Sequence, residues 1–131
     1  MGMRVLVVDD HPAMVGLITD ALAQAGFSVV SAEDGQTGLK AVEEHHPDLV
    51  ILDLSMPVMT GLQVLRVLRT RPETRFLPVI VLTGRDAAVD MLDCWMGGAD
   101  RYLVKPCSME ELLGAVRQML MEPAAHQADS R

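Results

Sequence analysis

The segment Leu49–Leu52, which reads LVIL and is followed at once by Asp53, decides the fold class. A short run of apolar, partly β-branched residues predicts a strand, and a run without polar alternation predicts that both faces of the strand are covered. Four similar apolar runs recur along the chain, at Met3–Val8, Phe27–Val30, Pro78–Leu82 and Tyr102–Val104. Of the five runs together, four are near-continuous. The pattern is typical of a parallel sheet with helices on both faces.

Helical periodicity fills the gaps between these strands. After Pro12, apolar side chains recur at the spacing of an amphipathic helix that ends near Gly26. Further helices are predicted from an N-cap at Asp34 to His45 and His46, from about Thr60 to Arg69, from about Asp86 to Met96, and from a capping box formed by Ser108 and Glu111. Strand and helix therefore alternate five times.

This alternation predicts an α/β fold, a flavodoxin-like doubly wound (βα)5 unit with a five-stranded parallel sheet in the order 2-1-3-4-5. In such folds, ligands bind outside the carboxyl ends of the strands. Residues 3–121 are expected to form this single domain. Residues 122–131 are small and polar, and we expect them to form a flexible C-terminal tail.

Composition excludes several classes of function. The 131 residues carry 18 acidic and 11 basic side chains, for a net charge of −7, and 3% are aromatic. Binding to a phosphate backbone needs clustered basic residues, so no direct nucleic-acid partner is expected. Cys94 and Cys107 form no CxxC pair, and neither a signal peptide nor a membrane span is apparent. These features favour a cytoplasmic protein with no membrane partner.

Chemically active residues follow the predicted strands. Asp9 and Asp10 follow the first, Asp53 the third, Thr83 the fourth and Lys105 the fifth. In a parallel sheet these positions share one edge. Two carboxylates about 4 Å apart repel by roughly 4 kcal/mol at an effective dielectric constant of about 20, so a cation is expected among them.

Mg²⁺ is the expected cofactor, because it prefers oxygen ligands and is commonly held by one or two carboxylates. A transition-metal site is less expected, since only His11 lies near the acids and neither cysteine does. With Lys105 as a second cation and Thr83 as a hydroxyl donor, the site suits phosphorylation of a carboxylate.

Four stretches in this order carry a resemblance to a known family: LVVDD, LVILDLSMP, VIVLTG and YLVKP. Asp53 and Thr83 lie thirty residues apart, and Thr83 and Lys105 twenty-two. From about Met3 to Met121 the chain resembles a response regulator receiver domain, the CheY-like module of two-component signalling. The resemblance implies a phosphorylation-dependent switch. It would control a partner through the surface formed by the predicted fourth helix at 86–96, the fifth strand at 102–104 and the fifth helix.

The resemblance also assigns roles to individual residues. Asp53 would accept the phosphoryl group from the phosphohistidine of a sensor histidine kinase or a phosphotransfer protein. Asp10 and Asp53 would bind Mg²⁺ directly, Asp9 would bind it through water, and Ser55 would offer its backbone carbonyl.

The remaining assignments concern the switch. Lys105 and Thr83 would bind the phosphoryl oxygens, and Gly84 would leave room for the group. Tyr102 would rotate inward when Thr83 moves, and Pro106 would follow a cis peptide bond. The downstream target protein stays unknown, and the output surface is also a candidate homodimer interface.

Three positions invite other interpretations. Thr60 stands where many relatives have an acid, and we interpret it as a helix N-cap. Cys107 replaces a common Phe and is interpreted as a buried, inert thiol. His11, before Pro12, is interpreted as a helix-start residue rather than a ligand.

Three functions remain in competition. The leading one is a stand-alone receiver, which is not an enzyme beyond assisting its own phosphorylation and dephosphorylation. The second is the receiver part of a longer DNA-binding response regulator, which the DDHP sequence at residues 9–12 resembles. The third is a Mg²⁺-dependent aspartyl phosphatase, although Ser55 stands where the haloacid-dehalogenase type has an acid.

Overall fold

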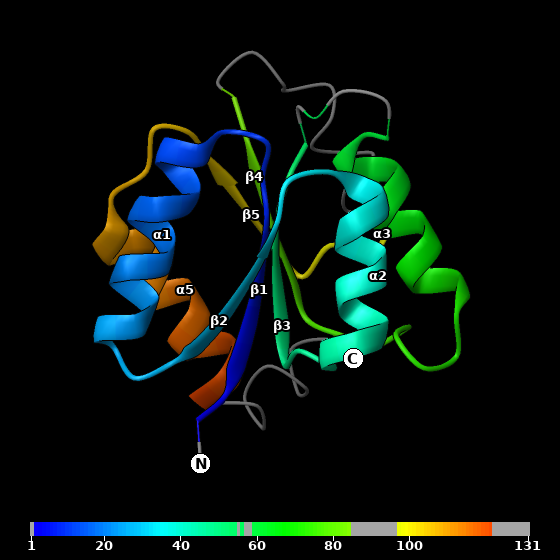
Figure 1. The fold of residues 1–131 in the computed structure, drawn as a ribbon, viewed down its shortest axis with the longest axis horizontal. Coiled ribbons are helices and arrows are strands. Elements are labelled where there is room, and N and C mark those ends of the chain that lie inside the picture. The colour runs from blue at the N-terminus through cyan, green and yellow to red at the C-terminus, as the bar shows by residue number, and fades with distance from the viewer. Residues whose placement is uncertain (1, 55, 57–58, 85–96, 122–131) are drawn as a thin grey trace.

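Five parallel strands form one sheet in the order β2-β1-β3-β4-β5 (Figure 1). The fold is taken from a computed structural model that describes residues 2–54, 56, 59–84 and 97–121. The elements in chain order are β1 (Arg4–Val8), α1 (Pro12–Gln24), β2 (Ser28–Ala32), α2 (Gly35–His45), β3 (Leu49–Asp53), α3 (Gly61–Thr70), β4 (Val79–Thr83), β5 (Arg101–Val104) and α5 (Met109–Met121). This topology confirms the predicted flavodoxin-like class.

The sheet separates two hydrophobic layers. Helices α1 and α5 cover one face, and α2 and α3 cover the other (Figure 1). Along β3, Leu49 and Ile51 belong to the layer under α1 and α5, whereas Val50 and Leu52 belong to the layer under α2 and α3. Successive side chains of a strand point to opposite faces, so a strand between two layers of helices is apolar at every position. This explains the unbroken LVIL run.

All five predicted strands are present, but most of their ends differ from the prediction by one or two residues, and the largest difference is at the end of β2. The second strand was expected to end at Val30, but β2 continues to Ala32, and each of its five residues pairs with one of β1. Ser31 is exposed because β2 is an edge strand, so the sequence there lacks the apolar character used to find strands. Strand β5 begins one residue early, at Arg101. The predicted helix 86–96 and the tail 122–131 lie outside the described residues.

Helix ends follow the predicted capping chemistry. The Asp34 side chain accepts a 2.8 Å hydrogen bond from Thr37 N–H and caps α2. At the start of α3, Thr60 and Gln63 form a complete capping box, which confirms Thr60 as an N-cap. The Ser108 hydroxyl accepts from Glu111 N–H at 3.0 Å before α5.

The carboxyl end of α1 is closed by a Schellman motif. Gly26 has a φ of 97°, a left-handed conformation that favours glycine. Its N–H donates to the Ala23 carbonyl, and Phe27 N–H donates to the Leu22 carbonyl, both at 3.0 Å.

Among the described residues, no helix is long and apolar enough to cross a bilayer.

Candidate functional site

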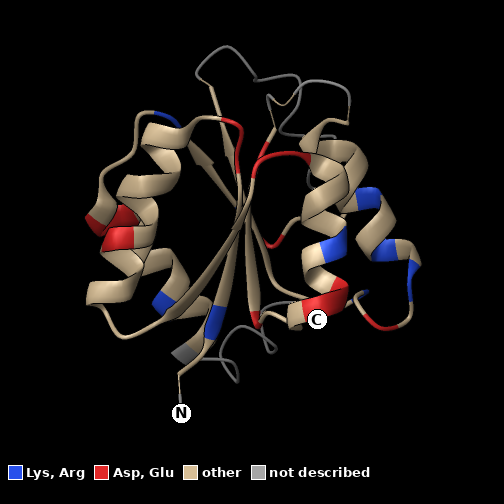
Figure 2. Cartoon of the chain, in the orientation of Figure 1, with Lys and Arg blue, Asp and Glu red and all other residues tan. Residues whose placement is uncertain are grey.

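The five predicted site residues that follow strands lie at one edge of the sheet. Asp9 and Asp10 directly follow β1, Lys105 directly follows β5, and Asp53 and Thr83 are the last residues of β3 and β4. Parallel pairing of all five strands brings these ends together. Acidic segments also gather at this edge in Figure 2, at the end of β1 and in the connection from β2 to α2.

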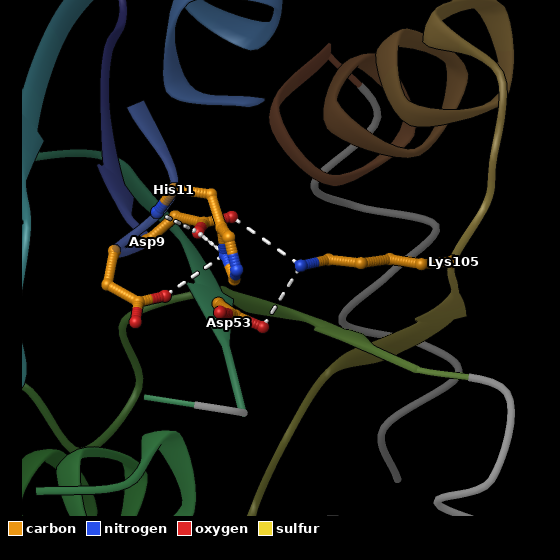
Figure 3. Close-up of polar contacts among 5 residues, drawn as sticks. Asp9, His11, Asp53 and Lys105 are labelled. Carbon is orange, nitrogen blue, oxygen red and sulfur yellow. Dashed lines mark hydrogen bonds and ion pairs between the residues drawn. The ribbon is translucent and has the colours of Figure 1, made fainter. Parts of the chain in front are cut away.

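Lys105 bridges the two most buried acids (Figure 3). Asp9 and Asp53 are each only 1% exposed. The Lys105 ammonium nitrogen lies 3.2 Å from Asp53 Oδ1 and 3.6 Å from Asp9 Oδ2. One ammonium among the carboxylates of Asp9, Asp10 and Asp53 leaves an excess of negative charge, which a divalent cation would offset.

His11 also reaches the acids. Its Nδ1 lies 3.0 Å from Asp9 Oδ1 and 3.0 Å from Asp10 Oδ1, and its backbone N–H donates to Asp9 Oδ1 at 2.9 Å (Figure 3). The hydrogen bond to Asp9 and the charge of Asp10 raise the pKa of His11 above its usual value. His11 is the N-cap residue of α1, as expected from the sequence. The sequence also placed it near the acids, but it did not predict the contact of the ring with Asp9 and Asp10.

The donor set fits a small, hard divalent cation. Ligand atoms from Asp9, Asp10, His11 and Asp53 all lie within 4.8 Å of one another. Three of the four side chains offer carboxylate oxygens, and two of these carboxylates are almost fully buried. Oxygen ligands with this density of negative charge suit Mg²⁺. Ser55, the predicted backbone ligand, lies outside the described residues.

Thr83 presents a buried hydroxyl. The residue is 1% exposed, and its Oγ1 has no hydrogen-bond partner within the described part of the chain. Its carbonyl accepts a 2.6 Å hydrogen bond from Lys105 N–H, which ties the ends of β4 and β5 together. Beside it, a Cβ built on Gly84 would meet no described atom within 4 Å. Within the described part of the chain, the space beside Gly84 is therefore open and the neighbouring hydroxyl lacks a partner.

The two other predicted residues lie on or after β5. Tyr102 is partly buried and packs against the layer under α2 and α3. The peptide bond between Lys105 and Pro106 is cis, which is the geometry that the resemblance implied. Cys107 is partly exposed rather than buried, and desolvation raises the pKa of its thiol. A raised thiol pKa is consistent with low reactivity.

A glycine behind the site was missed by the sequence analysis. Gly61, the first residue of α3, approaches the backbone of β3 so closely that an added Cβ would collide with the Asp53 carbonyl oxygen and lie 2.9 Å from Leu54 Cα. Contacts of this closeness essentially never occur for a real Cβ. The chain position alone does not reveal this, because the approach is made by a neighbouring element of the fold.

Comparisons with known proteins agree on one family. Residues 5–117 match the family model described as the response regulator receiver domain. The chain is 38% identical over 128 residues to the probable transcriptional regulatory protein TcrX of Mycobacterium tuberculosis, covering 98% of this chain and 54% of the relative. It is 41% identical over 120 residues to the DNA-binding response regulator MtrA of Mycolicibacterium smegmatis, covering 92% and 51%. The chain thus spans about half the length of these curated relatives.

Solved structures give the same result. The chemotaxis protein CheY4 of Vibrio cholerae superposes with a TM-score of 0.86 at 31% identity, covering 92% of this chain and all of the other. The receiver domain of the sensor histidine kinase PA1611 of Pseudomonas aeruginosa PAO1 gives a TM-score of 0.82 at 28% identity, covering 90% and 97%. That structure has a magnesium ion coordinated in its active site cleft.

Proposed function

Because the chain belongs to the response regulator receiver family, we propose that it is a two-component signalling switch in which Asp53 accepts a phosphoryl group. The observation that carries this proposal is the Asp53 carboxylate, buried at the end of β3, 3.2 Å from the Lys105 ammonium and beside Asp9 and Asp10. Receivers of this family are switches rather than classical enzymes. The activity assigned here is limited to the phosphorylation and dephosphorylation of the chain itself.

The metal would be held by Asp10 and Asp53 directly, by Asp9 through water and by the backbone carbonyl of Ser55. When bound, Mg²⁺ supplies positive charge that offsets the charge of the carboxylates and of the phosphoryl oxygens. The excess of carboxylates over the single ammonium of Lys105 supports this assignment.

In the transfer step, a carboxylate oxygen of Asp53 attacks phosphorus, and the bond from phosphorus to the donor's imidazole nitrogen breaks. The donor is a histidine kinase or a phosphotransfer protein. Lys105 pairs with a phosphoryl oxygen, and the Thr83 hydroxyl donates a hydrogen bond to another. The buried Thr83 hydroxyl supports these roles, and so does Gly84, where an added Cβ would meet no described atom within 4 Å.

Two such contacts approach the free energy that a switch needs. A hydrogen bond to a charged group contributes about 1.5 to 3 kcal/mol, and moving a two-state equilibrium from 1:99 to 99:1 takes roughly 5.5 kcal/mol. We assign Tyr102 as the residue whose side chain rotates inward when Thr83 moves. The output surface would comprise the predicted helix at 86–96, β5 and α5. The same surface would form the interface of any homodimer.

A second candidate, the receiver part of a longer DNA-binding regulator, is favoured by the relatives. The chain covers 51% of MtrA of Mycolicibacterium smegmatis, which is named a DNA-binding response regulator. The expected lack of a nucleic-acid partner followed from the acidity of these 131 residues. It does not extend to a longer protein, in which a region outside these residues would contact DNA.

The test is the intact mass after incubation with Mg²⁺ and acetyl phosphate. We expect addition of one phosphoryl group to the native chain and to Asp20→Asn, an exposed acid on α1, and none to Asp53→Asn. Addition that persists in Asp53→Asn would contradict the assignment. Steady turnover of p-nitrophenyl phosphate would instead support the phosphatase alternative.

A further inference from the structure

We propose that the imidazole of His11 is a ligand of the metal site formed with Asp9, Asp10 and Asp53, so that the site favours Co²⁺, Ni²⁺ and Zn²⁺ over Mg²⁺ more strongly than carboxylates alone would. This inference rests on the proposed function, because it concerns the same site. It assigns a ligand and a class of metal ion beyond the all-oxygen site expected for Mg²⁺.

The spacing of the ring and the carboxylates supports this. His11 Nδ1 lies 3.0 Å from one oxygen of Asp9 and 3.0 Å from one oxygen of Asp10. Neighbouring ligands of an octahedral ion with bonds of about 2.1 Å are also about 3.0 Å apart. The nitrogen therefore already lies at a ligand's distance from the oxygen of Asp10, a carboxylate assigned above as a direct ligand. In the metal-free protein, His11 Nδ1 is hydrogen-bonded to Asp9 Oδ1 at this distance.

Among the described residues, the only polar contacts of the ring are those with Asp9 and Asp10. His11 is the N-cap residue of α1, yet its side chain makes no capping hydrogen bond, unlike those of Asp34 and Thr60. Its backbone is held by the hydrogen bond to Asp9 and by Pro12 in the first turn of α1, whereas its side chain is 62% exposed. A fixed backbone with an exposed ring lets the imidazole turn toward an ion among the acids.

Ligand chemistry gives the predicted selectivity. Imidazole nitrogen binds Zn²⁺, Ni²⁺ and similar ions well, whereas Mg²⁺ favours carboxylates, carbonyls and water. An added nitrogen should therefore strengthen binding of the transition metals far more than binding of Mg²⁺. An all-oxygen site should show this preference less strongly.

The first test measures affinities for Mg²⁺, Co²⁺ and Zn²⁺ at one fixed pH by competition with a chromophoric chelator. Loss of a residue at a metal site commonly costs about 10- to 100-fold in affinity. In His11→Asn we expect the affinity for Co²⁺ and Zn²⁺, divided by that for Mg²⁺, to fall at least about tenfold. The matched control is the double variant His45→Asn/His46→Asn, which removes a histidine pair at the end of α2 and should leave this ratio unchanged.

The second test detects the ligand directly. In the Co²⁺-loaded native chain, a coordinated imidazole should give a strongly shifted, exchangeable N–H proton resonance. This resonance should be absent from His11→Asn and present in the His45→Asn/His46→Asn control. A resonance that survives in His11→Asn, or an unchanged affinity ratio, overturns the proposal.

Failure of this inference is distinguishable from failure of the proposed function. If the native chain is phosphorylated with Mg²⁺ but shows no shifted resonance with Co²⁺, His11 is not a ligand and the switch assignment stands. If the resonance is present but Asp53 is never phosphorylated, the ligand assignment stands and the proposed function fails.

Discussion

The ammonium nitrogen of Lys105 lies 3.2 Å from Oδ1 of Asp53, across 52 positions of the chain. The same nitrogen lies 3.6 Å from Asp9, so one cation serves two buried carboxylates. This shared contact links the ends of β1, β3 and β5. It makes the lysine important for the fold as well as for the proposed chemistry.

Replacing Lys105 by methionine should destabilise the metal-free protein. The substitution keeps the length of the side chain but leaves Asp9 and Asp53 buried without their cation, which should lower the free energy of unfolding by about 1 to 3 kcal/mol. Urea denaturation in the presence of a chelator measures this. Lys40→Met, on the exposed face of α2, is the matched control and should change little. Equal stability of the two variants would contradict the bridging role.

Mg²⁺ should stabilise the native chain through the acidic cluster. An ion that binds only the folded state at about 100 times its dissociation constant adds about 2.7 kcal/mol to the free energy of unfolding. Asp10→Asn should lose most of this increment. Without metal, it should be at least as stable as the native chain, since it removes one of three mutually repelling carboxylates. Thermal unfolding with and without Mg²⁺ measures both effects, and an undiminished increment in Asp10→Asn would argue against its role as a ligand.

Two glycine substitutions should act in opposite directions. A Cβ at Gly61 would collide with the backbone of Asp53 and Leu54, so Gly61→Ala should lower the free energy of unfolding by about 1 to 3 kcal/mol. Gly114 lies exposed within α5 with open space around it, so Gly114→Ala should raise stability by about 0.5 to 1 kcal/mol. Denaturant midpoints give both values. A neutral Gly61→Ala would mean that α3 can move away from β3 at little cost.

Thr83→Val should separate stability from signalling. The Thr83 hydroxyl is buried and lacks a hydrogen-bond partner among the described residues, so replacing it by a methyl group should leave the unphosphorylated chain at least as stable. The variant should still be phosphorylated at Asp53 but show a weaker conformational response. Amide spectra of β5 with and without beryllofluoride report this response, and a full response in Thr83→Val would remove Thr83 from the proposed relay.

The sequence predicted the sheet because the unbroken apolar run of β3 has a simple physical cause: its side chains enter two hydrophobic layers in turn. It was less informative for β2, where exposure of Ser31 at the sheet edge hides the strand's true end. Five site residues were identified because each one directly follows or ends a strand. The ring position of His11 and the close approach of Gly61 depend on side-chain direction and on packing between elements, which periodicity does not encode.

The placement of Asp53 on β3 has an evolutionary consequence. Both faces of this strand are packed, because Leu49 and Ile51 lie in one hydrophobic layer and Val50 and Leu52 lie in the other. A change of side-chain volume in either layer would therefore move the carboxylate slightly relative to Lys105, without altering any residue that contacts a ligand. Evolution can thus change the lifetime of the phosphorylated state through core substitutions outside the site. Related proteins with identical acids can then differ in that lifetime.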